Sequence, residues 1–291
     1  MNFIRKLYHH PKKILRVLYR AADFRSAKEK LLFSNALSDE EKALLSKVSL
    51  RVHRNDEMYK PIDARHYLSV GLSAVRCIEN ALDKSNGDKA VRHILDFPCG
   101  YGRVLRFLRV RFPDANITVS DINPVALDFC KRIFSVKSVM SDKDFNKLSL
   151  SGKFDLLWCG SLITHIDEKA TTDLLKFFHD HLSPGGLCVF TTHGQTSVEW
   201  IQGKRETYRL TEVAQQEVLS QFHEKGYGYA DYKNQRGIGI SVVSHDRMLV
   251  IARSVRQWNE TFYLEQGWDN HQDVYGFTNA EPGAAAEHAK A

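Results

Sequence analysis

The chain has 291 residues, of which 43% are hydrophobic and 26% charged, as is usual for a globular protein with one sizeable core. No stretch approaches the roughly 20 uncharged apolar residues that span a bilayer, and the N-terminus lacks the long apolar centre and cleavage site of a signal peptide. The five cysteines are odd in number and have no paired or metal-type spacing, which favours reduced thiols and a cytoplasmic location.

The net charge of +6 is concentrated at the N-terminus. Residues 1–30 contain nine Lys or Arg and two acidic residues, so the remaining 261 residues sum to −1. A basic body would have favoured nucleic acid as a partner. This charge distribution argues against it.

Residues 1–60 are predicted to form an N-terminal helical segment. Apolar residues recur at helical spacing, interrupted by Pro11, and Ser38 followed by three acidic residues is typical of a helix N-cap. Residues 61–83 form a further helical run that opens the predicted main domain, residues 61–291.

From residue 91 the pattern alternates between strands and helices. The predicted strands are 91–96, 116–120, 136–140, 154–159 and 186–192, and the predicted helices are 102–112, 124–134 and 168–182. Alternation of this kind predicts an α/β fold with a mostly parallel sheet and helices on both faces. A Pro-Gly-Gly turn is expected just before the strand at 186–192.

Residues 195–243 break this alternation and are predicted to form an inserted cap, because they are polar with short aromatic-rich pieces. A helix at 244–257 and two adjacent strands in "ETFYLEQGW" and "QDVYGFTN" are expected to close the sheet. The tail "NAEPGAAAEHAKA" is predicted to be disordered.

The stretch "HILDFPCGYGRVLRFL" places a carboxylate and two glycines at the end of the first strand. Gly100 and Gly102 would let a ligand approach the backbone closely, and Asp121 at the end of the next strand could accept ribose hydroxyls. The third glycine of the nicotinamide fingerprint is absent, and Asp96 would lie close to a pyrophosphate. A ligand with a cationic end, a ribose and no phosphate fits better, and S-adenosylmethionine is such a ligand.

Four segments, "ILDFPCGYGR", "ITVSDIN", "FDLLWCGSLITHI" and "LSPGGLCVFTTH", together resemble the class I S-adenosylmethionine-dependent methyltransferases. The resemblance covers about residues 91–278 and implies a Rossmann-like seven-stranded sheet whose last strand is antiparallel. Many members have glycine where this chain has Pro98, which stiffens the loop. The resemblance implies that Asp96, Gly100 and Gly102 line the methionine end, Asp121 holds the ribose, Asp142 flanks the adenine, and Cys159 and Gly160 border the cofactor at the fourth strand. Pro98, Cys99 and Ile122, their neighbours in the chain, are also expected to bind the cofactor.

Three of these acids have simpler alternatives. Asp96 and Asp121 could be helix caps, and Asp142 could belong to a solvated charge run with Lys143 and Asp144.

Three histidines follow strands at the expected cofactor edge. His165, His193 and His271 are therefore the candidate catalytic residues, because methylation of an alcohol needs a base tuned near neutrality. Each could instead be a hydrogen-bonded structural histidine. Metal is not expected, since the positions after the fourth and fifth strands hold "CGSLITH" and "TTHG" rather than acids. The Asn/Asp-Pro-Pro-Tyr/Phe motif of enzymes that methylate adenine or glutamine is also missing.

The segment "GWDNHQDVYGF" resembles a subgroup found beside glycosyltransferases in surface-polysaccharide pathways. This implies a small-molecule or glycan acceptor, foremost a sugar hydroxyl. The alternatives are N- or carboxyl-methylation of a secondary metabolite, a non-catalytic S-adenosylmethionine-binding module, and a nicotinamide oxidoreductase.

Residues 1–20 combine apolar residues at helical spacing with many Lys and Arg. Such an arm can contact an anionic membrane surface. The alternative, favoured by Pro11, is that its apolar side packs on the protein or on a second subunit.

Overall fold

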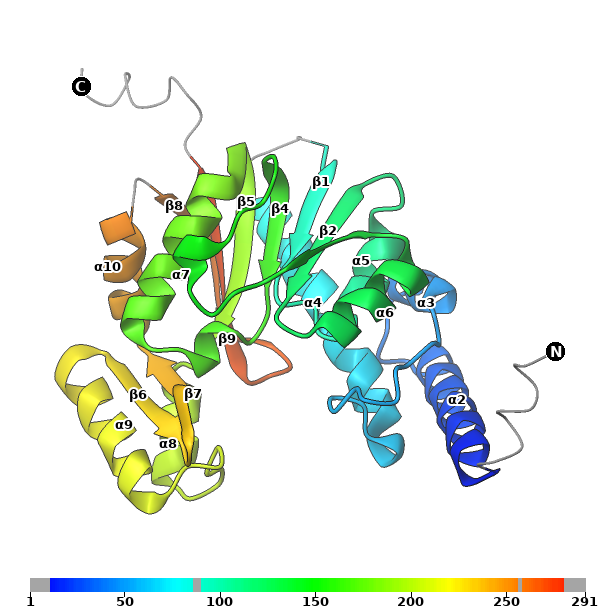
Figure 1. The fold of residues 1–291 in the computed structure, drawn as a ribbon, viewed down its shortest axis with the longest axis horizontal. Helices are drawn as coiled ribbons and strands as arrows, with labels where there is room; N and C mark the ends of the chain where they lie inside the picture. The colour runs from blue at the N-terminus through cyan, green and yellow to red at the C-terminus, as the bar shows by residue number, and fades with distance from the viewer. Residues whose placement is uncertain (1–10, 86–89, 256–257, 280–291) are drawn as a thin grey trace.

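The computed structural model describes residues 11–85, 90–255 and 258–279, and its centre is a seven-stranded sheet (Figure 1). The strand order is β3-β2-β1-β4-β5-β9-β8, with β1 to β5 parallel and β9 antiparallel to both of its neighbours. The predicted Rossmann-like fold is thereby confirmed. The strands are β1 His93–Asp96, β2 Asn116–Asp121, β3 Lys137–Met140, β4 Phe154–Cys159, β5 Leu182–Thr192, β8 Trp258–Trp268 and β9 Gln272–Asn279.

Alternate side chains of the central strands point to opposite faces of the sheet and pack into two separate apolar cores. In β4, Leu156 and Trp158 enter one core while Leu157 and Cys159 enter the other. Helices α4 (Ala64–Lys84), α5 (Leu105–Arg111) and α6 (Pro124–Phe134) pack on the first face, and α7 (Glu168–His181) and α10 (His245–Val255) on the second. Because both faces are covered, the strands have continuous apolar runs rather than alternation.

The Pro-Gly-Gly segment was predicted as a turn before the fifth strand, and this placement was wrong. Residues 184–186 lie within β5, which begins at Leu182. The pairing of β5 with β4 shifts register between Phe154 and Leu156, and this irregularity absorbs the extra residues. The helix expected to start at residue 102 begins at Leu105.

Residues 195–243 form α8 (Gln195–Gln202), α9 (Glu212–Lys225) and a hairpin of β6 (Tyr227–Tyr232) with β7 (Gln235–Val243), at the lower left of Figure 1. This segment has a small apolar core of its own. The backbone N–H of Val243 donates to the carbonyl of His193 at 2.9 Å, which ties the hairpin to the sheet.

The N-terminal segment contains α2 (Pro11–Leu32), α3 (Asp39–Lys47) and the short 3₁₀ helix η1 (Pro61–Asp63). Ser38 caps α3 in a capping box with Glu41, as predicted. Buried Phe24 of α2 packs edge-on against Tyr59 and Tyr67. The first ten residues and the tail from residue 280 lie outside the described part of the chain, and no described helix is long and apolar enough to cross a membrane.

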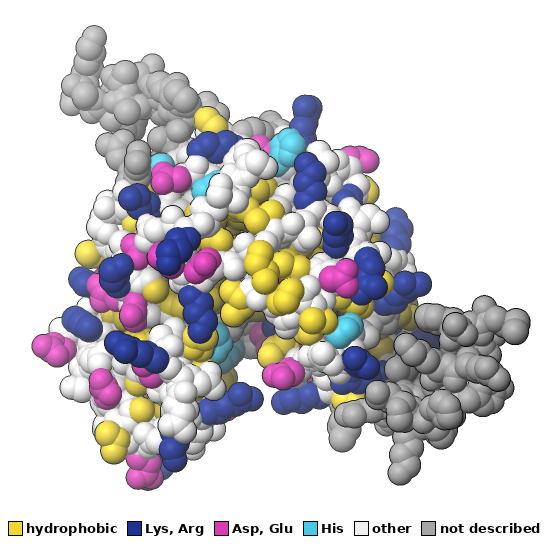
Figure 2. Space-filling model, in the orientation of Figure 1, with side chains coloured by type: hydrophobic (Ala, Val, Ile, Leu, Met, Phe, Trp, Pro, Cys, Tyr) yellow, Lys and Arg dark blue, Asp and Glu magenta, His cyan; other side chains and the backbone are white. Residues whose placement is uncertain are grey.

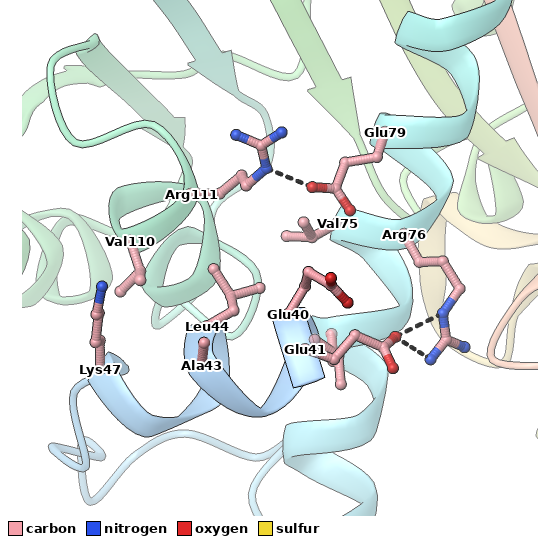
Figure 3. A pocket seen from close by; sticks show the side chains of 11 residues that line it. Glu40, Glu41, Ala43, Leu44, Lys47, Val75, Arg76, Glu79, Val110 and Arg111 are labelled. Atoms are coloured by element: carbon pink, nitrogen blue, oxygen red, sulfur yellow. Dashed lines mark hydrogen bonds and ion pairs between the residues drawn. The ribbon is translucent and has the colours of Figure 1, made fainter. Parts of the chain in front are cut away.

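Two ion pairs join the N-terminal segment and α5 to α4, around a groove of about 380 Å³ (Figure 3). Glu41 of α3 accepts from Arg76, and Glu79 of α4 accepts from Arg111 of α5. Leu44 and Val75 contribute apolar surface to the groove.

Gly71 of α4 lies in close contact with Phe107 of α5. A Cβ added there would collide with the ring of Phe107 and lie 2.6 Å from the carbonyl oxygen of Arg103. Alanine exceeds glycine in helix propensity by about 1 kcal/mol. Overpacking costs about 1–3 kcal/mol, so we expect Gly71→Ala to lower the free energy of unfolding in urea despite that propensity. Asn80→Ala, on the exposed side of the same helix, is the control and should not destabilise the protein.

Candidate active site

The turn between β1 and α5 contains the two glycines of the predicted cofactor loop. Gly100 and Gly102 both have positive φ, +50° and +78°, a conformation that favours glycine. A Cβ added at Gly100 would have no atom within 4 Å, whereas one at Gly102 would lie 2.6 Å from the Phe134 ring. Gly100 therefore faces open space, and Gly102 packs against α6.

A cavity of about 240 Å³, the first cavity, lies at the carboxyl ends of β1, β2 and β4. Strand order reverses here, between β1 and β4, which is where open α/β sheets bind ligands. Six of the predicted cofactor-binding residues line it: Asp96, Pro98, Cys99, Gly100, Asp121 and Gly160.

The other predicted cofactor residues lie around this cavity rather than on its walls. Gly102 and Cys159 are buried behind it. Ile122 is 51% exposed beside Asp121. Asp142 is exposed just after β3, where its carboxylate accepts from the backbone N–H of Asp144 at 2.9 Å.

Asp96 is a buried carboxylate with an unsatisfied oxygen. It is 1% exposed, and its Oδ2 has no hydrogen-bond partner among the described residues. Burial raises the pKa of Asp96, and the neighbouring charge of Asp121 raises it further. Because a buried charge without a partner is costly, this oxygen indicates a site for a cationic or hydrogen-bond-donating ligand.

Asp121 is held in place by the loop itself. Its Oδ2 accepts from the backbone N–H of Gly100 at 2.7 Å and its Oδ1 from that of Asn123 at 2.9 Å. Burial raises the pKa of Asp121, and these bonds oppose the rise. A carboxylate oxygen has two acceptor positions, so each oxygen keeps one for a ligand hydroxyl.

A second cavity of about 400 Å³ brings the three predicted histidines together. His165, His193 and His271 all line it, and His165 lines the first cavity as well. The ring centroids of His193 and His271 are 5.0 Å apart. In Figure 2 the molecule is hollowed between the α8–α9 segment at the lower left and the α2 side, and histidine and basic side chains border the hollow.

Hydrogen bonds assign the tautomers of two of these histidines. His165 Nδ1 donates to the carbonyl of Gly239 at 2.9 Å, and His193 Nδ1 donates to that of Ser241 at 3.2 Å. Since a carbonyl only accepts, the neutral rings carry the proton on Nδ1 and the lone pair on Nε2. Burial lowers the pKa of both histidines, which keeps them neutral at pH 7.

His271 is arranged differently. Its Nε2 lies 2.6 Å from the hydroxyl of Tyr208 and 3.3 Å from that of Ser197. Burial raises the pKa of Tyr208 to about 12, so this phenol remains protonated at neutral pH. The acids that flank His271 in sequence bond elsewhere, Asp269 with His66 at 3.3 Å and Asp273 with Tyr263 at 3.1 Å.

Sequence reasoning missed several residues of both cavities. Asp56 and Met58 reach the first cavity from residues 48–60, the strap between α3 and η1, and no motif identifies them. Arg103, Trp158 and Trp268 also line the first cavity. Trp200 and Tyr208 line the second, and the only available signal was that they are aromatic residues in a polar segment.

Comparisons with known proteins agree with this geometry. Residues 94–186 match the family described as a methyltransferase domain. A malonyl-[acyl-carrier protein] O-methyltransferase from Acetivibrio thermocellus is 25% identical over 155 residues, 53% of this chain and 54% of that protein. A protein of the same name from Priestia megaterium is 28% identical over 107 residues, 35% of this chain and 36% of that protein. The chain thus spans about half the length, or less, of these curated relatives.

Solved structures support the same fold. Streptomyces venezuelae DesVI is similar with a TM-score of 0.52 and 14% identity, over 79% of this chain and 100% of that one. CalS10 from Micromonospora echinaspora, solved with S-adenosylmethionine bound, has a TM-score of 0.50 and 14% identity over 78% of this chain and 100% of that one. At these identities the likeness establishes the fold. Residues 94–186 are therefore similar to a methyltransferase domain, within a fold that this chain shares with S-adenosylmethionine-binding methyltransferases.

Asp96 makes the stability of the ligand-free protein depend on pH. Its pKa is raised on folding, so the folded state binds this proton more tightly than the unfolded chain. The free energy of unfolding should therefore fall as the pH rises from about 4 through the raised pKa. Asp96→Asn should remove this part of the pH dependence and stabilise the ligand-free protein at pH 7, as measured by urea unfolding between pH 4 and 8. Exposed Asp142→Asn is the control, and an Asp96→Asn protein less stable than wild type at pH 7 would contradict the expectation.

Proposed function

We propose that this protein transfers the methyl group of S-adenosylmethionine to a hydroxyl of a polar small molecule or glycan, foremost a sugar hydroxyl. The observation that carries the proposal is that His165 lines both cavities. A group that borders the cofactor on one side and a separate pocket on the other is placed to act on an acceptor in that pocket.

The residues of the first cavity and its rim fit this cofactor. The unpartnered Oδ2 of Asp96 suits the ammonium group, and the two free acceptor positions of Asp121 suit the ribose hydroxyls. Ile122 and Met140, each 51% exposed at the ends of β2 and β3, offer apolar surface for the adenine, with Asp142 beside them. When bound, the cofactor supplies a methyl group on a positively charged sulfur.

His165 is the proposed general base. Its Nδ1–H is fixed by Gly239, its Nε2 lone pair is available, and its lowered pKa keeps it neutral. It can therefore accept the proton of an acceptor hydroxyl during methyl transfer. His193 is more deeply buried, at 3% exposure, and the Nε2 of His271 already has two partners. We assign these two to shaping the acceptor pocket.

The lining of the second cavity suits a polar, flat-sided acceptor. The Trp200 and His271 rings are stacked at 4.5 Å, and Tyr208 adds a hydroxyl beside them. Apolar ring faces with a few fixed polar groups are typical of small-molecule sites. CalS10 is described as an amino pentose methyltransferase, and the resemblance to a subgroup found beside glycosyltransferases also favours a sugar.

A carboxylate acceptor is the second candidate. The curated relatives are named as O-methyltransferases of malonyl-[acyl-carrier protein], and Arg209 lines the second cavity. A carboxylate is already a nucleophile at pH 7 and needs no base. Dependence on His165 therefore separates the two candidates.

Replacement of Asp121 tests the cofactor. Asp121→Ala should weaken S-adenosylhomocysteine binding by about 1–3 kcal/mol in calorimetry, because the ribose hydroxyls lose their acceptors. Exposed Asp128→Ala is the matched control and should bind as wild type does. Tight NADH binding with no response to S-adenosylhomocysteine would overturn the proposed function.

Replacement of His165 tests the base. Mass spectrometry of sugar nucleotides and lipid-linked glycans incubated with the protein and S-adenosylmethionine identifies an acceptor. With a hydroxyl acceptor, His165→Ala should lower kcat by about 10²- to 10⁴-fold, and exposed His223→Ala should not. The wild-type kcat should stay constant below pH 6.5 and fall only as His165 with its lowered pKa is protonated. An unchanged kcat in His165→Ala with a hydroxyl acceptor would remove this residue as the base.

The N-terminal arm, residues 1–20, remains a prediction with two alternatives. Phe24 and Ala27, further along α2, are buried, which favours packing on the body of the protein. We therefore expect the full chain not to float with phosphatidylglycerol vesicles at low salt. Flotation that high salt weakens and that deletion of residues 1–20 abolishes would instead establish a peripheral membrane contact.

A further inference from the structure

Strand β7 anchors two of the three histidines of the second cavity. His165 Nδ1 donates to the carbonyl of Gly239 at 2.9 Å, and His193 Nδ1 donates to that of Ser241 at 3.2 Å. Carbonyls two residues apart in a strand point to the same side, with a spacing of about 7 Å. The two rings are therefore attached side by side along one edge of β7.

The backbone near both histidines is bound to the same part of β7. The N–H of Val243 donates to the carbonyl of His193 at 2.9 Å. The Ser241 hydroxyl donates to the carbonyl of Ile163 at 2.5 Å, in the 3₁₀ helix that ends at His165. Each ring is thus held both through its backbone and through its Nδ1, so the β6–β7 hairpin sets the direction of both Nε2 atoms.

Both of these Nε2 atoms are acceptors without a partner. No described residue bonds to the Nε2 of His165 or His193, and both rings line the second cavity. The Tyr232 hydroxyl lies 3.2 Å from the Nδ1 of His165, not beside its Nε2. His271 differs, because its Nε2 lies 2.6 Å from the Tyr208 hydroxyl. The cavity therefore offers two free lone pairs that are fixed relative to each other.

Charge decides which groups these two nitrogens can bind. Burial lowers the pKa of His193, and the neighbouring rings of His271 and His165 lower it further. Burial also lowers the pKa of His165. Neutral rings with a free lone pair attract hydrogen-bond donors and repel carboxylate or phosphate oxygens. The two nitrogens therefore fit a pair of donors, and hydroxyls are the donors that a sugar carries.

Hydroxyls on adjacent carbons match the spacing of the two rings. A hydroxyl oxygen lies about 2.8 Å from the atom to which it donates, so two such bonds span most of the roughly 7 Å between the anchoring carbonyls. The remainder suits neighbouring hydroxyls better than distant ones. A single hydroxyl would satisfy His165 and leave the Nε2 of His193, which is 3% exposed, without a donor.

We propose that His193 accepts a hydrogen bond from the hydroxyl next to the one that is methylated, and that His165 and His193 together select acceptors with hydroxyls on adjacent carbons. This inference rests on the proposed function, because His165 is the base of the same reaction. It assigns His193 a direct contact with the acceptor.

Sugar nucleotides with and without the second hydroxyl test the pair. UDP-glucose, UDP-galactose, GDP-mannose, dTDP-rhamnose and lipid-linked glycans are incubated with the protein and S-adenosylmethionine, and tandem mass spectrometry locates the methylated oxygen. We expect a free hydroxyl on the carbon next to it. The monodeoxy analogue that lacks this hydroxyl should have a KM about 2- to 10-fold higher with wild type, which is the effect of one hydrogen bond.

His193→Phe keeps an aromatic ring and removes the lone pair. It should raise the KM of the complete acceptor by the same factor and leave the KM of the deoxy analogue within about twofold of wild type. His193→Gln should recover part of the loss, because its amide oxygen can accept a hydrogen bond. Exposed His223→Phe is the control and should not change either KM. Unchanged turnover of the deoxy analogue shows that each variant is folded.

The possible outcomes separate this inference from the proposed function. An equal loss with both acceptors in His193→Phe, or a loss with neither, would overturn the role of His193 and leave the proposed function intact. Nitrogen NMR at pH 7 gives a second measurement, and a proton on the Nε2 of His193 would have the same consequence. Methyl transfer to no hydroxyl of any of these acceptors would overturn both.

Discussion

The return of the chain from β3 to β4, beside β1, is the constraint on which the candidate site depends. It creates a gap between the loops that follow β1 and β4, because those loops lead to opposite sides of the sheet. Asp96 ends β1 at this gap, and Asp121 ends the next strand. The apolar cores on the two faces of the sheet fix the positions of these strands. The positions of the two acids at the strand ends therefore depend on the packing of the cores.

Both cavities depend on polar groups that the fold leaves incomplete. At Asp96 the incomplete group is a buried anion, and at His165 and His193 it is a ring nitrogen whose opposite nitrogen is anchored to a carbonyl. Most buried polar groups in proteins are fully bonded, so such exceptions cluster where ligands bind. Here they lie on two adjoining cavities that share one histidine.

The sheet could be predicted from the sequence because strands covered on both faces are continuous apolar runs. The acids at the strand ends could be predicted as well, because they directly follow these runs. The convergence of the three histidines could be anticipated only as a shared edge, since their separation depends on how β7 crosses His165 and His193. The Pro-Gly-Gly segment lies inside β5 rather than before it, because residues 183–186 form an irregularity that β4 does not pair, with Gly185 at positive φ. Arg103 and Arg106 look alike in sequence, but the strap supplies carbonyls to Arg106 and not to Arg103.

Arg106 joins segments that the sequence pattern separates at residue 60. Its guanidinium donates hydrogen bonds to two carbonyl oxygens of the strap. Arg106 itself belongs to the helix that follows the cofactor loop. Tyr101 of that loop also stacks on His53 of the strap, with the ring centroids 4.7 Å apart. Without residues 48–60, a guanidinium that is now 1% exposed would lose those acceptors. The residues matched by the methyltransferase family thus include a buried cation, two of whose acceptors lie outside the matched range. A fragment trimmed to residues 94–186 would leave that cation without the carbonyls of Ser49 and Arg51.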